Sequence, residues 1–405
     1  MSSIDRKLNA VNFVLADVRG GLGPFVSVYL VTAAGWTAAE TGVVLTISGL
    51  IGIALHTPVG AMIDAVRDKR LILIAGVALL VASAIAIQQA PFIPIVFVAD
   101  VVMGVLGGVF APTMAALTLG LVPESAFLKR LARNTVWDRL GNLFIAAVTG
   151  LVGWVWPQRS IFYIVPLFGL ISVAAILTIP PSAIDHERAR GFEPGQTSKH
   201  PQGLWSLLTG NRPLLLLALT IGTFNFANDA MLPLIGQKLG LSHPGLETAL
   251  TSACILVAQI TTIPTAILLG TRAGASGLRR LLALACAALA LRGLIFATFE
   301  SPVILVAAQV LDGVATGIWD ILLPLILSDF VTGSGRYSTS RGALDTVQGL
   351  GGSLSNAAGG AMVLAGGYDA AFALLALFAA VAFILAVCLP SPHAIKVSRI
   401  ASGVR

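Results

Sequence analysis

Three polar side chains share one helix face in the apolar stretch TFNFANDAMLP. Asn225, Asn228 and Asp229 stand at positions i, i+3 and i+4, and Pro233 follows where it can kink the helix. Packing alone is a poor explanation for three polar groups on one face of an apolar segment. Because burial in an apolar cavity raises the pKa of a carboxyl group, Asp229 could take up a proton there and release it elsewhere. We therefore predict a binding site for a proton or a polar ligand at this face.

A second polar set lies near the N-terminus, in LADVRGGLGPFVSVYL, residues 15–30. Asp17 and Arg19 are two positions apart, so they leave a helix in nearly opposite directions, and at most one can readily face a central cavity. The glycines permit close helix packing, and Pro24 deprives the carbonyl group of Gly20 of its usual helical donor. A structural charge pair beside a packing face is the alternative to a binding role.

Two further stretches hold acidic side chains within apolar surroundings. Asp138 and Arg139 in RNTVWDRLGN diverge by about 100° around a helix, and Asn142 shares a face with Arg139. An inter-helix salt bridge near the cytoplasmic end is the alternative for this pair. Asp312 and Asp320 are eight residues apart, so they could share one broad helix face, and Asp312 has no partner close in sequence.

The residues predicted for a pathway of substrate and protons are Asp17, Arg19, Asp138, Arg139, Asn142, Asn225, Asn228, Asp229, Asp312 and Asp320.

Other ionisable residues receive a structural interpretation. We expect Arg292 to face lipid or to snorkel towards the interface, and His56 to serve packing rather than proton relay. Cys254, Cys286 and Cys388 have neither a metal-ligand spacing nor a paired pattern, which argues against disulfides and zinc. No nucleophile–base pair, metal cluster or phosphate loop is recognisable, so we expect no enzyme, no ATP-driven pump, no cofactor and no metal.

The elements that position these residues must be membrane-spanning helices. Of the 405 residues, 56% are hydrophobic and only 11% are charged, whereas soluble chains average about 25% charged residues. A chain of this composition could not cover the surface of a soluble domain. Segments of about 20 apolar residues indicate spans and predict an all-α membrane protein. The twelve predicted spans are 10–33, 40–62, 71–89, 93–120, 133–156, 160–180, 213–236, 246–269, 281–299, 302–328, 342–365 and 368–389.

The basic residues predict the orientation of these spans. Cytoplasmic loops are enriched in Lys and Arg. With both termini inside, most of the 25 Lys and Arg residues fall on the inner side, and only Arg159 and Lys238 fall outside. We expect a multi-pass protein of the plasma or inner membrane with both termini in the cytoplasm. Basic inner loops account for the net charge of +6, so we expect no nucleic-acid partner.

The chain contains an internal repeat at an offset of about 210 residues. DVVMGVLGGVF, from Asp100, aligns with QVLDGVATGIW, in which Gly104 pairs with Gly313 and Gly108 with Gly317. Two pseudo-symmetric six-span halves with a polar linker are the plan of many secondary transporters, whose binding site lies between the halves. The predicted parts are an N-terminal half at 1–184, a cytoplasmic linker at 185–211 and a C-terminal half at 212–405.

The loop GAMIDAVRDKR, residues 60–70, carries the most specific motif. Together with the spans and the repeat, it resembles the major facilitator superfamily, whose signature here is Gly-x-x-x-Asp followed by a basic cluster. Arg67 and Asp68 stand where that family usually has a second glycine and then an arginine. The resemblance implies alternating access and a cytoplasmic latch between the halves, with positive-inside anchoring as the alternative. The residues assigned to this gate are Gly60, Asp64, Arg67, Lys69 and Arg70.

Two comparisons within this family bear on direction and coupling. Its drug–proton antiporters have an arginine in span four, four residues before a glycine, where this chain has Asp100 before Gly104. Its efflux members have a glycine-rich signature in span five, and Gly141 and Gly150 keep the first spacing of that signature. The prediction is proton-coupled export of a small organic compound by a monomer in the lipid bilayer. Proton-coupled uptake of an organic anion or metabolite is the alternative, which Arg19 and Arg139 favour.

A receptor that transports nothing is a more distant alternative. It would need an appended soluble domain, and the longest loop has only about 30 residues.

Overall fold

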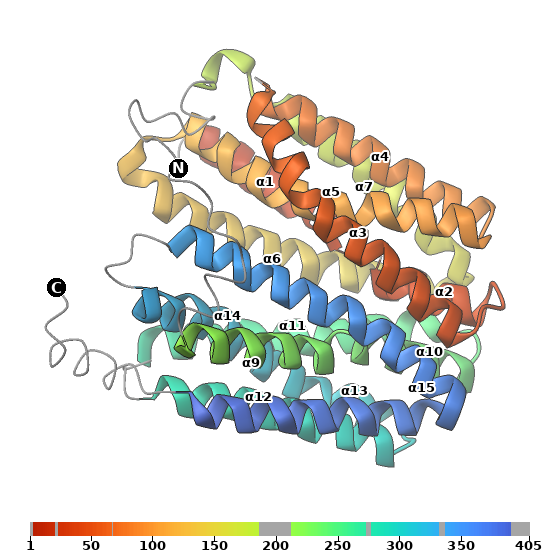
Figure 1. The fold of residues 1–405 in the computed structure, drawn as a ribbon. Helices are drawn as coiled ribbons and strands as arrows, with labels where there is room; N and C mark the ends of the chain where they lie inside the picture. Colours follow the sequence, from red (N-terminus) through yellow and green to blue (C-terminus); the bar gives the residue numbers. More distant parts are fainter. Residues whose placement is uncertain are drawn as a thin grey trace, which may run out of the picture. The chain divides into compact units, whose positions relative to one another are not determined.

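The computed structural model describes residues 3–20, 23–66, 68–185, 212–272, 277–331 and 337–389 of the chain. Within these ranges every regular element is a helix (Figure 1), which confirms the predicted all-α class. The elements are α1 (Ser3–Gly20), α2 (Gly23–Thr32), α3 (Ala38–Ala65), α4 (Lys69–Gln89), α5 (Ile93–Leu121), α6 (Glu124–Val155), η1 (Gln158–Ser160), α7 (Ile161–Leu177), η2 (Pro181–Ala183), α9 (Arg212–Asn228), α10 (Met231–Ser242), α11 (Glu247–Arg272), α12 (Leu278–Thr298), α13 (Pro302–Ala307), α14 (Gln309–Val331) and α15 (Tyr337–Cys388).

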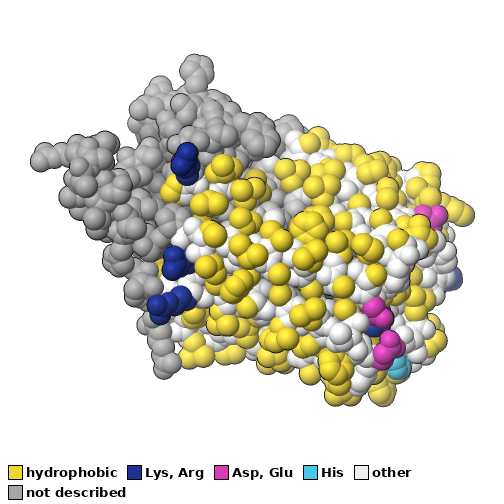
Figure 2. Space-filling view, turned by 60° about the horizontal axis from the view of Figure 1, so that its bottom comes forward, with side chains coloured by type: hydrophobic (Ala, Val, Ile, Leu, Met, Phe, Trp, Pro, Cys, Tyr) yellow, Lys and Arg dark blue, Asp and Glu magenta, His cyan; other side chains and the backbone are white. Residues whose placement is uncertain are grey.

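Many of these helices have the length and composition of membrane spans. In the described ranges, nine helical segments are long and apolar enough to cross a bilayer. Large apolar side chains are exposed on them, such as Val303 at 77% and Leu364 at 73%. Figure 2 shows hydrophobic side chains spread over the face in view. A surface of this kind is suited to lipid, because soluble monomers rarely expose apolar patches above a few hundred Å².

The last of the nine segments is long enough for two crossings. Ser340–Cys388 has 49 residues, which at about 1.5 Å per residue exceeds twice the hydrocarbon thickness of about 30 Å. Its backbone leaves the helical conformation at Gly367, where φ is 81°. Only glycine adopts such a conformation without strain. This interruption falls between the predicted spans 342–365 and 368–389, where the sequence reads GGYDA from residue 366.

Two predicted spans have helices that are not among the nine apolar segments. Span one corresponds to α1 and α2, and span five corresponds to α6, which carries several charges in its first half. The number of twelve spans therefore stays a prediction.

The chain divides into two compact units. Unit 1 comprises Met1–Thr37, Val44–Thr197 and Leu239–Ala253, and unit 2 comprises Ala38–Val43, Ser198–Lys238 and Cys254–Arg405. The predicted halves at 1–184 and 212–405 stay a prediction, and all of the predicted linker except Asp185 lies outside the described residues.

Each unit is held together by helices that bury apolar side chains against one another. In unit 1, α1 packs on α6 and α7, and α4 packs on α5 and α7. In unit 2, α15 packs on α9 and α12, and α12 packs on α14. Aromatic pairs add to this packing: in unit 1 the ring centroids of Tyr29 of α2 and Phe162 of α7 are 4.8 Å apart, and in unit 2 those of Phe296 of α12 and Phe372 of α15 are 5.2 Å apart.

The sequence repeat has a structural counterpart inside the two units. In unit 1, Gly104 of α5 lies against Gly52 of α3. In unit 2, Gly313 of α14 lies against Thr261 of α11. The two members of the second pair stand 209 positions after those of the first, as numbering shows. Small residues at these positions let helix backbones approach closely, so the matched glycines have the same packing role in both units.

Candidate functional site

A broken helix organises the polar cluster of unit 2. The helix α9 ends at Asn228, and α10 begins at Met231. This interruption lies within the four residues before Pro233, which has no N–H group to donate to the carbonyl group of Asp229. At the break, the N–H group of Ala230 donates to Ser355 Oγ of α15 at 3.1 Å. The break thus turns backbone groups towards a neighbouring helix at the position where the sequence places its polar set.

Arg292 of α12 is the centre of this cluster. Its side chain is 1% exposed, and it forms an ion pair with Asp312 of α14. It also donates to Asn228 Oδ1 of α9 at 2.8 Å and to Gln309 Oε1 of α14 at 3.4 Å. The expectation that Arg292 faces lipid or snorkels is therefore wrong. The signal for its role was an arginine inside an apolar helix with an unpartnered acid on the next long helix.

The three polar residues at the end of α9 and in the break have different contacts rather than one shared binding face. Asn228 binds Arg292, whereas Asn225 is buried and donates to the carbonyl group of Ile221 in its own helix at 2.9 Å. Asp229 is exposed, and its carboxylate lies against Gly352 of α15, where a Cβ atom would collide with it. Asp229 is close enough for the charges of Arg292 and Asp312 to act on it. The cluster therefore joins one exposed acid to a buried ion pair.

The two acids of α14 have different environments. Asp312 is half-buried in the ion pair with Arg292, whereas Asp320 is exposed. Beside Asp320, the indole ring of Trp319 stacks on Phe224 of α9, with centroids 4.3 Å apart and an interplanar angle of 5°. Only Asp312 of this predicted pair belongs to the Arg292 cluster.

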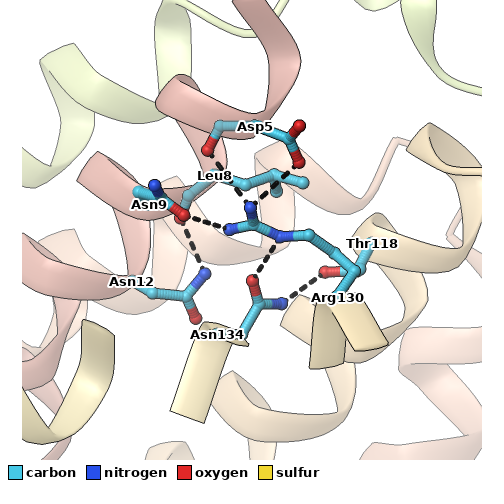
Figure 3. Close-up of polar contacts among 7 residues, drawn as sticks. All are labelled: Asp5, Leu8, Asn9, Asn12, Thr118, Arg130 and Asn134. Carbon is cyan, nitrogen blue, oxygen red and sulfur yellow. Dashed lines mark hydrogen bonds and ion pairs between the residues drawn. The ribbon is translucent and has the colours of Figure 1, made fainter. Parts of the chain in front are cut away.

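Unit 1 contains a second buried guanidinium group (Figure 3). Arg130 of α6 is 4% exposed and pairs with Asp5 Oδ1 of α1 at 3.1 Å. It also donates to Asn9 Oδ1 of α1 at 2.7 Å and to Asn134 Oδ1 at 2.9 Å. Burial lowers the pKa of Arg130, and the contact with Asp5 opposes this effect. Arginine nevertheless remains charged in proteins, so the network holds a fixed positive charge between α1 and α6.

The network extends to a third helix and a cavity. Asn134 Nδ2 donates to Thr118 Oγ1 of α5 at 2.8 Å. An open cavity of about 110 Å³ lies beside it, with Asn12, Asn134, Thr135 and Asp138 as polar lining residues. Asp138 is among the predicted pathway residues, whereas Arg130 counted only as one of the basic residues on the inner side. A signal was present, because Asp5, Asn9 and Asn12 stand at i, i+4 and i+7 on one face of α1.

The other predicted residues of α6 are placed differently. Asn142 donates to the backbone carbonyl group of Asp138 at 3.0 Å. Arg139 is half-buried, and neither it nor Asn142 is among the described lining residues of the cavity. The structure therefore brings one of the three predicted side chains of α6 to the cavity.

The predicted gate is only partly described. Arg67 and the side chains of Asp17, Arg19, Gly60 and Asp64 lie outside the described residues.

The described basic residues of the gate belong to the packing of unit 1. Lys69 is buried and donates to the carbonyl group of Val66 at 3.0 Å. Arg70 pairs with Asp68 at 2.8 Å and donates to the carbonyl group of Ile179 at 2.8 Å. Asp68, a departure from the family motif, accepts the N–H group of Arg70 at 3.0 Å and caps α4.

These features define a helical protein with charged groups placed deep in apolar helices, as expected of a membrane transport protein. Comparison with known proteins gives its family. The model of the Major Facilitator Superfamily matches residues 8–354. The chain therefore belongs to this superfamily, which confirms the resemblance and identifies a multi-pass membrane transporter rather than an enzyme.

The relatives and solved structures agree with this assignment. Two Mycobacterium tuberculosis proteins, the uncharacterized MFS-type transporter Rv2456c of strain H37Rv and MT2531 of strain CDC 1551, are each 38% identical over 383 residues, covering 94% of this chain and 92% of theirs. The nucleoside transporter NupG is 16% identical with a TM-score of 0.74, covering 96% of this chain and 98% of its own. A bacterial homologue of the lysosomal transporter Spinster is 12% identical with a TM-score of 0.68, covering 95% and 96%. Both structural likenesses concern the fold.

Proposed function

We propose that this protein is a proton-coupled secondary transporter that exports a small organic compound by alternating access. The observation that carries the proposal is the cluster of Arg292, Asp312 and Asn228 beside the helix break at Asp229. Discontinuous helices commonly form the binding sites of secondary transporters, because the break frees backbone groups and places polar side chains at mid-membrane depth.

The cost of charge in a bilayer supports a functional role for the cluster. A charged side chain at the centre of a membrane helix costs about 2.5–3.5 kcal/mol on insertion scales. Arg292 and Asp312 compensate each other, but Asp229 is an exposed acid within the apolar segment Arg212–Ser242. Exposure to lipid would be unfavourable for this carboxylate, so we infer that it faces a water-filled passage and takes up a proton there.

Asn228 connects Asp229 to the buried ion pair of Arg292 and Asp312. The side chain of Asn228 accepts a hydrogen bond from Arg292, and Asp229 is the next residue in the sequence. When Asp229 is ionised, its charge competes with that of Asp312 for the guanidinium group. When Asp229 is protonated, the pair of Arg292 and Asp312 is favoured. Proton binding can thus shift the balance of contacts among α9, α12 and α14.

The glycines of α6 support export. A Cβ atom at Gly150 would lie 2.8 Å from that of Ser252, and Gly153 lies against Thr248, so α6 packs closely on the first part of α11 within unit 1. Gly150, together with Gly141, keeps the first spacing of the glycine-rich signature that efflux members of the family have in this segment, whereas Gly153 and Pro157 do not complete the signature. The direction in which protons move relative to the compound distinguishes export by antiport from uptake by symport.

The test uses purified protein in liposomes. A thermal-shift screen against nucleosides, organic cations and organic anions first identifies a compound that binds, and an enclosed pH-sensitive dye then reports proton movement with it. We expect the compound and protons to move in opposite directions. Asp229→Asn should abolish accumulation against a gradient while retaining exchange of the compound. Asp345→Asn, at an exposed acid paired with Arg341, is the matched control and should transport normally.

Movement of protons in the same direction as the compound would replace export with uptake. Normal accumulation by Asp229→Asn would remove this acid from the coupling mechanism.

A further inference from the structure

A second polar seam lies in unit 1, between α3 and α5. Ser48 and Gly52 of α3 are one helical turn apart and face Asp100 and Gly104 of α5, which are also one turn apart. The small residues bring the two backbones together, since a Cβ atom at Gly52 would lie 3.3 Å from the carbonyl carbon of Gly104. His56 follows one turn later, with Nε2 3.3 Å from the carbonyl oxygen of Gly104. Close packing fixes Asp100 against Ser48.

The hydroxyl group of Ser48 has two oxygen atoms within hydrogen-bond distance but only one proton. Its Oγ atom lies 2.6 Å from the carbonyl oxygen of Val44 and also makes a short contact with Asp100 Oδ2. The hydroxyl group can donate to Val44 or to Asp100, but its single proton cannot fully serve both acceptors. A proton on the carboxyl group of Asp100 would satisfy both contacts at once, because the hydroxyl group would then donate to Val44 and accept from Asp100.

We propose that Asp100 is a second proton-binding site, with its carboxyl group protonated and donating to Ser48 Oγ. On release, the O–H bond of the carboxyl group breaks, the proton passes to water, and a carboxylate remains. The Ser48 hydroxyl group then turns from Val44 to donate to that carboxylate. Because a serine bonded to the carbonyl group four residues earlier bends a helix, loss of this bond changes α3 locally. The coupling role rests on the proposed function, whereas the proton site itself does not.

The charged groups around the seam leave Asp100 without an ion-pair partner in the described part of the chain. On α3, Glu40 and His56 are each eight residues from Ser48, or about 12 Å along the axis. On α4, Lys69 and Arg70 occupy the first turn, whereas Asp100 lies near the beginning of the antiparallel α5.

The helices α6 and α1 also contact α5. Their described charged residues lie further along α5 than Asp100 does. On α6, Asp138 lines a cavity together with Ala111, eleven residues from Asp100 and about 16 Å along the axis. On α1, Asp5 pairs with Arg130, and the side chains of Asp17 and Arg19 lie outside the described residues. Arg139, which follows Asp138 on α6, is half-buried. Because no described cation forms an ion pair with Asp100, the neutral acid is the favoured form.

Infrared spectroscopy tests the proton site without any substrate. A protonated carboxylic acid has a carbonyl stretching band that neither a carboxylate nor a histidine gives, and exchange into heavy water shifts this band. We expect the purified wild-type protein to show the band at neutral pH and Asp100→Asn to lose its Asp100 component. Ser48→Ala should shift that component, because it removes the hydrogen-bond acceptor. Asp229→Asn and Asp345→Asn are controls that should retain it.

An unchanged band in Asp100→Asn would overturn the proposal. If that variant does not fold, Asp100→Glu can replace it, because it places the carboxyl group one methylene further from the backbone. This variant should shift the Asp100 component, and an unshifted spectrum would equally overturn the proposal. The coupling role is tested separately by exchange of the compound identified in the binding screen. Because Asp229 remains, Asp100→Asn should weaken the pH dependence of this exchange, and an unchanged dependence would assign the coupling elsewhere. A wild-type protein that shows the Asp100 band but no proton-linked transport would contradict the proposed function and leave the proton site standing.

Discussion

Arg292 of α12 and Asp312 of α14 form an ion pair in the interior of unit 2, twenty positions apart in sequence. Removing one partner leaves an unpaired buried charge, which typically costs about 3–5 kcal/mol, whereas replacing both by apolar residues is often neutral or stabilising. We therefore expect Asp312→Leu to lower the melting temperature in detergent strongly, and the double variant Arg292→Met with Asp312→Leu to recover most of the loss.

The control for this experiment is Asp320→Asn, at an exposed acid two turns further along α14. It should melt near the wild-type temperature. A double variant that melts no higher than Asp312→Leu would show that Arg292 is not held mainly by its charge partner.

The packing glycines give a second prediction. A Cβ atom at Gly141 of α6 would collide with the carbonyl oxygen of Phe13 of α1, and one at Gly351 of α15 would collide with that of Gly222 of α9. Because these are rigid backbone contacts, Gly141→Ala and Gly351→Ala should each lower the melting temperature, with a loss of about 1–3 kcal/mol as in other overpacked sites.

Gly107 of α5 is the matched control for the glycine variants. Among the described residues, no atom outside its own stretch of helix would lie within 4 Å of a Cβ atom at this position. Gly107→Ala should be neutral or should stabilise the helix by up to about 1 kcal/mol, since alanine is the better helix former. Equal effects at Gly107 and Gly141 would contradict a role for close α1–α6 packing.

Structural features that depend on a single helix can be predicted from this sequence, whereas side-chain contacts between two helices cannot. The break at Asp229 and the turn at Gly367 follow from Pro233 and from a glycine pair, whose conformational effects are local. The partner of Arg292 depends on how α12 and α14 are rotated against each other, which no spacing along either helix determines. Without that rotation, an isolated arginine in an apolar stretch was equally consistent with snorkelling.

The same reason explains why Asn225, Asn228 and Asp229 separate in the structure. Their spacing places them on one side of an unbroken helix, but the helix ends at Asn228. Asn228 contacts Arg292, whereas the carboxylate of Asp229 lies against Gly352 of α15. Local periodicity can therefore predict a polar region but not which partner each of its members contacts.

The Arg130 network gives a third prediction. Arg130 joins α6 to Asp5 and Asn9 of α1, and an unsatisfied buried donor costs about 1–3 kcal/mol, with more for a charged group. Asn9→Ala should therefore lower the melting temperature, and Asn9→Asp should lower it less, because it restores an acceptor for the guanidinium group. Asn142→Ala, at an amide that donates within its own helix, is the control. Equal losses for Asn9→Ala and Asn9→Asp would show that the contact with Arg130 is not what holds α1.

The predicted orientation can be tested by labelling with a membrane-impermeant maleimide in intact cells. The background replaces the three native cysteines, Cys254, Cys286 and Cys388, with serine. Single cysteines are then introduced by Gln89→Cys at the end of α4, Pro244→Cys after α10, and Gly195→Cys in the predicted cytoplasmic linker. Gln89 and Pro244 are exposed, and the distribution of Lys and Arg places both outside. We expect labelling of these two positions in intact cells and of position 195 only after permeabilisation, which also serves as the control that the third cysteine is reactive. Labelling of position 195 in intact cells, with positions 89 and 244 protected until permeabilisation, would reverse the orientation.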